Sequence, residues 1–265
     1  MKVVLFCGGQ GMRLREYSEK IPKPMVPIGY RPIIWYVMKY YAHFGHKDFI
    51  LCLGYQADAI KDYFVKYNEY VSNDFVFSSG GNVLNLLHKD IDDWTITFVD
   101  TGINSNIGQR LKGVEKYLDG EEMFLANYSD GLTDLPLPGM IESFKNSNAT
   151  GMFMASRPSQ SFHVVSYDEN NDVKEISALS KAGVSINAGY FAFRHEIFDY
   201  IKPGEELVEQ PFRRLMAMNK LKAYPYRGLF LTMDTFKEKQ ALDDMYARGE
   251  TPWEVWRNTE LQAAS

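Results

Sequence analysis

The sequence of 265 residues has only two cysteines, Cys7 and Cys52, and no run approaching the ~20 apolar residues that a membrane-spanning helix needs. Each cysteine lies inside a short apolar run, VVLFC or FILCLG, of the kind that forms a buried strand. We interpret both as reduced thiols in the core of a cytoplasmic protein. The first run ends in glycines after Cys7, so it is too short for the apolar region of a secretory signal peptide.

An excess of positive charge is also missing, because 29 Lys and Arg stand against 34 Asp and Glu, a net charge of −5. This balance argues against binding to nucleic acid or to an anionic membrane surface, so any bound anion must be held by local positive charge. The five histidines are scattered and no cysteine pattern accompanies them, which argues against a zinc site. A composition of 45% hydrophobic and 24% charged residues is typical of a globular protein.

Strand and helix patterns alternate along the first half of the chain. Strands are expected at 2–7, 48–55, 94–102 and 123–131, and helices at 31–45, 56–70, 106–118 and 139–147. This alternation predicts an α/β protein with three layers and a mostly parallel central sheet. After Thr150 the pattern changes to short strands at 151–158, 162–169, 172–179 and 188–194, which predict a small antiparallel elaboration of a mixed sheet.

The chain contains no internal repeat and no linker rich in Pro, Gly and Ser. We therefore expect a single domain over residues 1–257, followed by a frayed tail over residues 258–265.

A glycine-rich segment, GGQGMRL at 8–14, follows the first predicted strand. It is not a P-loop, and it does not fit the dinucleotide fingerprint because Leu14 stands where a glycine is needed. A glycine turn at a strand end lets backbone N–H groups approach phosphates closely, and Arg13 and Lys23 would add positive charge. The alternative is an ordinary strand–loop turn whose charges are solvated.

This segment, together with PKPM at 22–25, resembles the signature of the sugar-1-phosphate nucleotidyltransferase family. The resemblance continues through YSDGLTDL, INAGYFAF, LTMDT and PWEVW, and thus along nearly the whole chain. It implies a Rossmann-like nucleotidyltransferase fold. The VDTG and RL elements and the closing Trp motif resemble the branch of cytidylyltransferases that act on glucose 1-phosphate. One departure is Met12, where the family usually has threonine.

The resemblance also implies roles for residues around the nucleotide. Arg13 and Lys23 would be catalytic, neutralising charge on the triphosphate and at the reacting centre. The nucleotide itself would contact six further residues: Gly8, Gly9, Gly11, Met12, Ser105 and Arg110. For Arg110 the alternative is a solvated helix face that it shares with Lys112 and Lys116.

Two aspartates match the metal-binding positions of the family. Asp130 lies at the end of a predicted strand and Asp234 at the end of an apolar run, and two carboxylates together with phosphate oxygens suit Mg²⁺. Each has a structural alternative. Asp130 could belong to an Asp-Gly turn, and Asp234 could be the N-cap of a helix that begins near Phe236.

On the acceptor side, Asn187 matches the residue that contacts the sugar. The Glu-Lys-Pro element that the family uses to hold the sugar phosphate is absent, and Ala178 and Leu179 stand in the expected region. Lys181 is the nearby lysine that could replace its charge. Ala188 also stands where the family has a glycine.

These features predict a Mg²⁺-dependent transfer of CMP from CTP to glucose 1-phosphate, giving CDP-glucose and pyrophosphate. Because the Glu-Lys-Pro element is missing, a different sugar phosphate or a non-sugar phosphate or phosphonate remains an alternative acceptor. Two other classes are a regulatory nucleotide-binding homologue without turnover and, less in keeping with the glycine pattern, a dinucleotide-dependent oxidoreductase. The aromatic segment 66–77 and the closing PWEVW at 252–256 suggest a homo-oligomer, although both could instead cover the core.

Overall fold

A seven-stranded mixed sheet forms the centre of the molecule in the computed structural model, which describes residues 1–9, 21–158 and 162–257. The strand order is β14 (Leu221–Tyr226), β10 (Gly151–Ser156), β13 (Ile186–Arg194), β8 (Met123–Asn127), β1 (Val3–Phe6), β4 (Asp48–Leu53) and β7 (Thr95–Asp100). β13 runs antiparallel to its two neighbours, whereas every other adjacent pair is parallel. The prediction of a mixed, mostly parallel sheet is confirmed.

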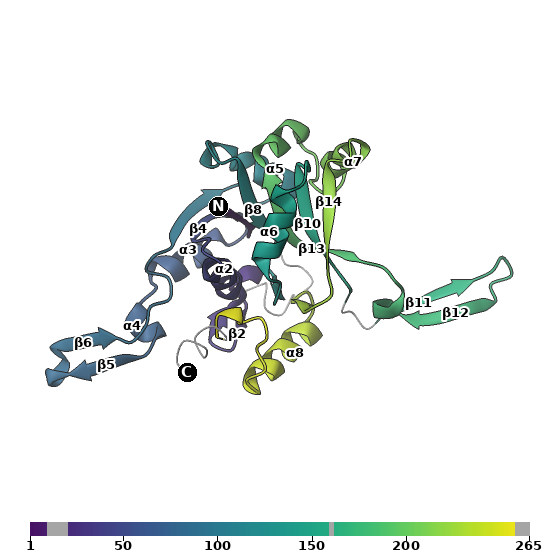
Figure 1. Cartoon of the computed structure of the whole chain (residues 1–265). Helices are drawn as coiled ribbons and strands as arrows, with labels where there is room; N and C mark the ends of the chain where they lie inside the picture. Colours follow the sequence, from purple (N-terminus) through teal and green to yellow (C-terminus); the bar gives the residue numbers. More distant parts are fainter. Residues whose placement is uncertain (10–20, 159–161, 258–265) are drawn as a thin grey trace.

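Helices cover both faces of this sheet (Figure 1). The α-helices are α2 (Ile33–His43), α3 (Ala57–Val65), α4 (Glu69–Ser72), α5 (Ile107–Gly113), α6 (Leu137–Lys145), α7 (Gln210–Ala217) and α8 (Phe236–Ala247). The side chains of α2 and α6 pack with Val3 and Leu5 of β1, and those of α5 and α7 pack with Val4 and Phe6 on the opposite face. The three-layer arrangement is therefore confirmed.

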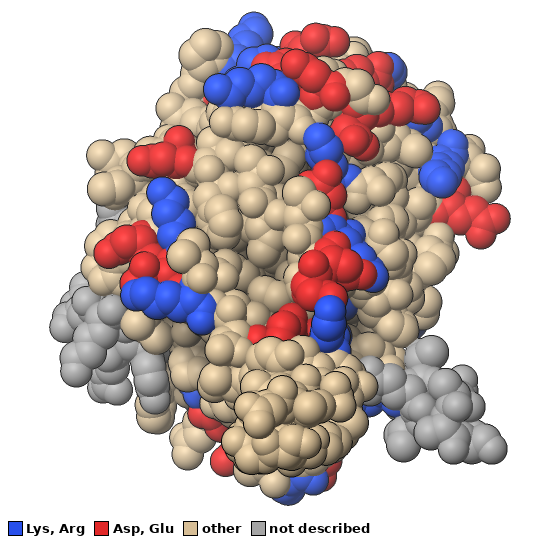
Figure 2. Space-filling view, turned by 90° about the vertical axis from the view of Figure 1, so that its left-hand side faces the viewer, with Lys and Arg blue, Asp and Glu red and all other residues tan. Residues whose placement is uncertain are grey.

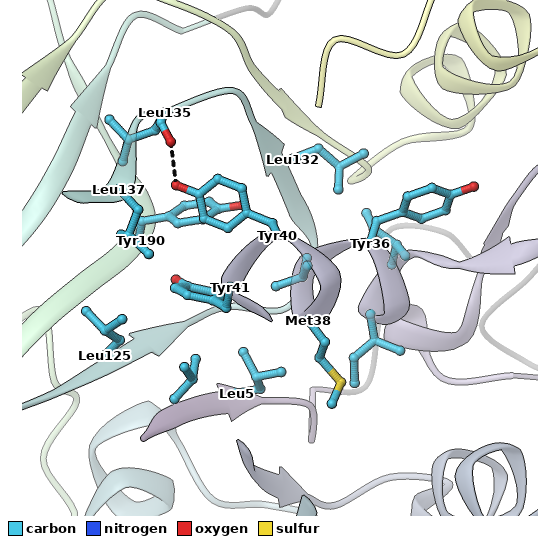
Figure 3. Packing of buried hydrophobic residues seen from close by; sticks show 14 of the residues in the cluster. Leu5, Tyr36, Met38, Tyr40, Tyr41, Leu125, Leu132, Leu135, Leu137 and Tyr190 are labelled. Atoms are coloured by element: carbon cyan, nitrogen blue, oxygen red, sulfur yellow. Dashed lines mark hydrogen bonds between the residues drawn. The ribbon is translucent and has the colours of Figure 1, made fainter. Parts of the chain in front are cut away.

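Helix α2 is buried almost all round, because it lies between the sheet and the smaller elements at its side. Its tyrosine hydroxyls reach backbone oxygens. Tyr40 donates to Leu135 at 2.8 Å (Figure 3), and Tyr36 donates to Ile28 at 2.9 Å. The ring of Tyr41 stacks on that of Tyr190. Hydrogen bonding of the hydroxyls lets these large rings fill the core without leaving a buried polar group unpaired.

Two hairpins extend from opposite sides of the molecule (Figure 1). One pairs β5 (Phe75–Ser78) with β6 (Val83–Leu86), and the other pairs β11 (His163–Tyr167) with β12 (Val173–Ala178). Figure 2 looks onto the side of the first hairpin and shows an uncharged projection in its lower part. The second hairpin confirms the antiparallel strands expected after Thr150, whereas the first was not predicted as a hairpin.

Smaller elements complete the fold. β9 (Gly131–Thr133) pairs with β15 (Phe230–Thr232), and β2 (Pro27–Ile28) pairs with β3 (Arg31–Pro32). Short 3-10 helices are η2 (Lys23–Met25), η3 (Ser79–Gly81), η4 (Glu115–Tyr117), η5 (Leu179–Lys181) and η6 (His195–Tyr200). The described residues include no helix with both the length and the apolar character of a membrane span.

The closing PWEVW segment covers the core. Trp253 and Trp256 are both buried, and the ring of Trp256 meets that of Trp35 edge to face. The interpretation that this segment covers the core of its own chain is thus confirmed. Cys7 and Cys52 are buried free thiols, as expected. The predicted tail at 258–265 lies outside the described residues.

Candidate functional site

The glycine turn follows β1 at the carboxyl edge of the sheet. The N–H of Cys7 still donates to Cys52 of β4 at 3.0 Å, so the turn proper begins at Gly8. Gly8 is buried and Gly9 is exposed. Gly11, Met12 and Arg13, which were predicted to complete the nucleotide site, lie outside the described residues.

Arg110 lies directly beneath this turn. Its side chain comes from α5, and the residue is only 2% exposed, so the interpretation as a solvated helix face is wrong. One terminal nitrogen, Nη2, donates to the backbone oxygens of Gly8 at 2.8 Å and Ile103 at 3.3 Å. The other, Nη1, donates to the backbone oxygen of Leu53 at 3.1 Å and to Oγ1 of Thr101 at 2.8 Å.

Two glycines make room for this guanidinium. A Cβ on Gly8 would lie 1.9 Å from Nη1 of Arg110, and a Cβ on Gly54 would lie 2.9 Å from the same atom. Arg110 therefore joins the ends of β1 and β4, through the backbone oxygens of Gly8 and Leu53, to the segment that follows β7, through the Thr101 hydroxyl and the backbone oxygen of Ile103. Burial lowers its pKa, and the nearby Cys52, Cys7 and Asp100 act in the opposite direction. The predicted contact of Arg110 with a triphosphate stays a prediction.

Ser105 belongs to the loop between β7 and α5. Its hydroxyl donates to the backbone oxygen of Thr101, and the next residue, Asn106, caps α5 through a reciprocal pair of hydrogen bonds with Gln109. The loop is thus fixed at both ends, which orders it beside the glycine turn. The nucleotide contact predicted for Ser105 stays a prediction.

Asp130 is presented by a strained backbone. The preceding residue, Ser129, is fully buried and has φ 64°, a left-handed conformation that is uncommon for a residue with a side chain. The N–H of Ser129 donates to Oδ1 of Asn127 at 2.7 Å, and its hydroxyl lies 2.9 Å from the backbone oxygen of Phe6. Such strain persists where the surroundings fix it and is common at functional sites. The left-handed residue here is Ser129, whereas Gly131 begins strand β9.

Asp234 lies between β15 and α8. The N-cap of α8 is Thr235, which accepts a hydrogen bond from the N–H of Glu238, so the interpretation of Asp234 as the N-cap is wrong. The carboxylate of Glu238 in turn accepts from the N–H groups of Asp234 at 2.8 Å and Thr235 at 2.9 Å. This capping box fixes the backbone on both sides of the Asp234 side chain.

Lys23, Asp130 and Asp234 converge on one point. Nζ of Lys23 lies 2.6 Å from Oδ2 of Asp130 and 2.5 Å from Oδ1 of Asp234. The pairing of β9 with β15, which places Gly131 opposite Thr232, brings the two carboxylates together across about a hundred residues of chain. Burial lowers the pKa of Lys23, but the two carboxylates together outweigh it, so its pKa is raised and it remains a cation.

This arrangement fits a divalent metal ion. Two carboxylate oxygens already point at a single positively charged atom, which is the geometry that a shared cation requires. In the part of the chain that the structure describes, no group of three or more His, Cys, Asp and Glu side chains could hold a metal by itself. A Mg²⁺ ion between these carboxylates would therefore need phosphate oxygens or water as further ligands.

On the acceptor side, Asn187 lies at the start of β13. Its Oδ1 accepts from the N–H of Gly189 at 2.9 Å, and its Nδ2 donates to the hydroxyl of Tyr128 at 3.4 Å. Gly189 has φ 74°, and a Cβ there would lie 2.3 Å from the Tyr128 ring. Lys181 lies on η5, where it lines a cavity of about 390 Å³ whose lining includes none of Lys23, Asp130 and Asp234. The sugar contact predicted for Asn187 and the phosphate contact predicted for Lys181 stay predictions.

Sequence reasoning missed the residues that support the site. Ser129 and Gly54 have no local sequence signal that distinguishes them from ordinary loop residues. The capping box of Thr235 and Glu238 could have been found, because Thr followed three residues later by Glu is a known helix start. That signal would have moved the N-cap from Asp234 to Thr235.

Comparisons with known proteins identify the family of the chain. The family described as nucleotidyl transferase matches residues 2–225. The chain is similar to the glucose-1-phosphate cytidylyltransferases of Salmonella typhi and Salmonella typhimurium, each 36% identical over 97% of this chain and 100% of the relative. It is less similar to a UTP–glucose-1-phosphate uridylyltransferase of Synechocystis, with 25% identity over 78% of this chain and 52% of that protein.

Solved structures show the same fold at low sequence identity. A UDP-glucose pyrophosphorylase complexed with UDP-glucose superposes with a TM-score of 0.69 at 18% identity, covering 94% of this chain and 98% of that one. HddC from Yersinia pseudotuberculosis gives a TM-score of 0.63 at 22% identity, covering 92% of this chain and 99% of that one. These likenesses concern the fold, and they agree with the expected Rossmann-like nucleotidyltransferase architecture.

Proposed function

Because the chain belongs to the nucleotidyl transferase family and is an enzyme of that type, we propose that it transfers CMP from CTP to a phosphorylated small-molecule acceptor and releases pyrophosphate. The observation that carries this proposal is the convergence of Lys23, Asp130 and Asp234 on one point. CTP as the nucleotide is supported by the similarity to cytidylyltransferases over almost the full length of both chains.

Glucose 1-phosphate is the first acceptor to test, since the most similar named relatives cited above act on it according to their names. Another sugar phosphate, or a non-sugar phosphate or phosphonate, is favoured by one observation. The Glu-Lys-Pro element of the family is replaced, and the segment in its place forms the end of β12 and the short helix η5.

In the reaction, a phosphate oxygen of the acceptor attacks the α-phosphorus of CTP. A new P–O bond forms, the bond to the bridging oxygen of the β-phosphate breaks, and pyrophosphate leaves with the electron pair. The attacking oxygen is already an anion at neutral pH, so no general base is required. Catalysis then consists of positioning the two phosphates and neutralising their charge.

The charge to be neutralised is large. Two unit charges 4 Å apart repel each other by about 4 kcal/mol at an effective dielectric constant near 20, and each substrate carries more than one. In our proposal Lys23 leaves its carboxylate partners and bridges the reacting phosphates, while Arg13 neutralises the leaving pyrophosphate. Arg110 acts from below by holding the backbone of the glycine turn.

Mg²⁺ is the cofactor that we propose for Asp130 and Asp234. When bound, the ion would supply positive charge to phosphate oxygens and orient them. The chain's own contribution is the fixed spacing of the two carboxylates, which the β9–β15 pairing and the capping box of α8 maintain.

We also propose that the enzyme is a cytoplasmic homo-oligomer. The segment expected to pack on a neighbour includes Phe75 and Phe77, which are 39% and 63% exposed on the β5–β6 hairpin. A two-stranded hairpin is marginally stable alone in water, and apolar side chains on it favour cover by another surface. A second copy of this chain is the partner we propose. The uncharged β5–β6 hairpin of each copy would then be covered by the same hairpin of the other copy.

The test is pyrophosphate release from a panel of CTP, UTP, GTP, ATP and dTTP with glucose 1-phosphate, other sugar 1-phosphates and simple phosphonates, with and without Mg²⁺. We expect release with CTP and a phosphorylated acceptor only when Mg²⁺ is present. Nucleotide binding without release from any combination would instead identify a regulatory homologue.

A further inference from the structure

A second region of positive charge lies at the cavity lined by Lys181. The cavity has a volume of about 390 Å³, within the usual range for a small-molecule site. Its lining comes from three segments, namely the end of β10, the end of β14, and the loop between η5 and β13. Three of the lining residues are cations, Arg157, Lys181 and Arg227, and none of the lining residues is acidic.

These three cations are not neutralised within the described residues. None of them is among the ion pairs formed there, although many other Lys and Arg side chains of this chain are paired. Asp134 lies next to the cavity, but its Oδ1 accepts from the hydroxyl of Tyr226 at 2.7 Å and from the N–H of Leu229 at 2.8 Å. Unpaired cations around one hollow create a local positive potential that attracts an anion.

The cavity wall is ordered by backbone geometry. Gly228 lets the chain fold back over Tyr226, because a Cβ at that position would lie 2.3 Å from the tyrosine oxygen. With its hydroxyl fixed on Asp134, Tyr226 supports the turn that carries Arg227. On the other side Gly183, with φ 71°, turns the loop that follows Lys181. Arg227 and Lys181 thus lie beside turns of defined geometry.

The cavity opens at the same edge of the sheet as the reacting centre. β13 runs antiparallel to β8 and β10, so the carboxyl ends of β8 and β10 meet at one edge, together with the start of β13. Asn187 of β13 stands opposite Ala155, which lines the cavity. β10 is two strands from β8, the strand that leads to Asp130, which corresponds to about 10 Å along the edge. A small acceptor can span this distance.

We infer that the acceptor carries a second anionic group, a phosphate, phosphonate or carboxylate at the end away from the reacting phosphate, and that Arg157, Lys181 and Arg227 bind it. This inference rests on the proposed function, because it assigns the reacting phosphate to Lys23 and the second group to the cavity. It also accounts for the loss of the Glu-Lys-Pro element, since recognition moves from sugar hydroxyls to a second charge.

The experiment compares glucose 1-phosphate with glucose 1,6-bisphosphate as acceptors at saturating CTP and Mg²⁺. We expect kcat/KM for the bisphosphate to exceed that for the monophosphate by roughly tenfold to a hundredfold, as for one charge-assisted contact. Arg227→Gln and Lys181→Ala should each reduce this ratio by about tenfold. Arg213→Gln, which removes a charge from an exposed position on α7 outside the cavity, should leave the ratio at its wild-type value.

Equal kcat/KM for the two acceptors in the wild type would overturn the inference, as would inhibition by the bisphosphate without its turnover. If no pyrophosphate is released with either acceptor, the proposed function fails for these sugar phosphates. Calorimetric binding of glucose 1,6-bisphosphate then tests separately whether the cavity binds an anionic group. Binding that is weakened at least tenfold in Arg227→Gln but not in Arg213→Gln supports the anion site. Absence of binding, or equal binding by both variants, overturns it.

Discussion

Nη2 of Arg110 donates a 2.8 Å hydrogen bond to the backbone oxygen of Gly8, so a buried side chain of α5 holds the first residue of the glycine turn from below. The same guanidinium reaches the ends of β4 and β7. The turn that we propose for phosphate binding is therefore fixed by a cation that has hydrogen-bond partners within the protein.

The first prediction concerns the two adjacent glycines of the turn. Gly8→Ala should lower the free energy of unfolding by about 1–3 kcal/mol, because the new methyl group would overlap the Arg110 guanidinium. Gly9→Ala is the matched control, since a Cβ there meets no described atom within 4 Å. Urea unfolding of the two variants measures the difference. Equal stability of the two would show that Arg110 does not occupy the space beneath Gly8.

The second prediction separates the supporting role of Arg110 from direct nucleotide contact. Arg110→Met should lower the free energy of unfolding by about 3 kcal/mol or more, because several buried backbone oxygens would lose a charged donor. Lys112→Met, on the same helix but partly exposed, should change it by less than about 1 kcal/mol. A stable Arg110→Met variant with a KM for CTP raised tenfold or more would instead identify a triphosphate ligand.

The third prediction concerns competition between Lys23 and a metal ion for the same two carboxylates. In Lys23→Met the position between Asp130 and Asp234 loses its cation, so Mg²⁺ alone should bind more tightly than in the wild type. Saturating Mg²⁺ at a hundred times its Kd would stabilise the variant by about 2.7 kcal/mol, which a thermal shift would detect. The variant should also turn over at least ~100-fold more slowly. A larger Mg²⁺ shift in the wild type would contradict this competition.

The fourth prediction tests the carboxylates directly. Asp130→Asn and Asp234→Asn should each raise the Mg²⁺ concentration needed for half-maximal activity by about tenfold or more, because each removes a charged oxygen ligand. Asp62→Asn, which alters an exposed carboxylate paired with Lys66, is the control and should leave that concentration unchanged. A normal Mg²⁺ requirement in either site variant would show that the carboxylate is not a ligand.

The fifth prediction concerns assembly through the β5–β6 hairpin. Phe77→Asp should dissociate the proposed homo-oligomer, because it places a charge on the apolar surface that a second copy would cover. Val65→Asp, at a residue 79% exposed on α3 and outside the hairpin, is the control and should keep the wild-type mass. Light scattering coupled to size exclusion gives the mass of each. A wild-type chain that is monomeric at micromolar concentration would end this proposal.

Several features of the fold could be predicted from the sequence because their causes are local. The apolar runs predicted strands at 2–7 and 48–55, where β1 and β4 lie, and the helical pattern at 31–45 predicted the helix that the structure has at Ile33–His43. Periodicity and turn residues act over a few positions, so they are visible in a single sequence. The positions of Asp130 at a strand end and of Asp234 at the end of an apolar run were predicted on the same basis.

The burial of Arg110 and the β5–β6 hairpin could not be predicted from local sequence patterns. With Lys112 and Lys116 nearby, Arg110 fits the pattern of an exposed helix face. It is buried because Gly8 and Gly54, far away in the chain, leave the space that its guanidinium occupies. The hairpin carries apolar residues without a core to bury them, so the hydrophobic pattern does not distinguish it from a loop.

By itself, the sequence determined the class of fold, the glycine turn at a strand end and the identity of the charged residues near it, because these depend on local pattern. The tertiary structure alone decided that Lys23 lies between Asp130 and Asp234, and that three cations without an ion-pair partner among the described residues line one cavity. Both facts depend on strand pairings between distant segments, β9 with β15 and β10 with β13 and β14. Side chains that such pairings bring together carry no signal of their proximity in the order of the residues.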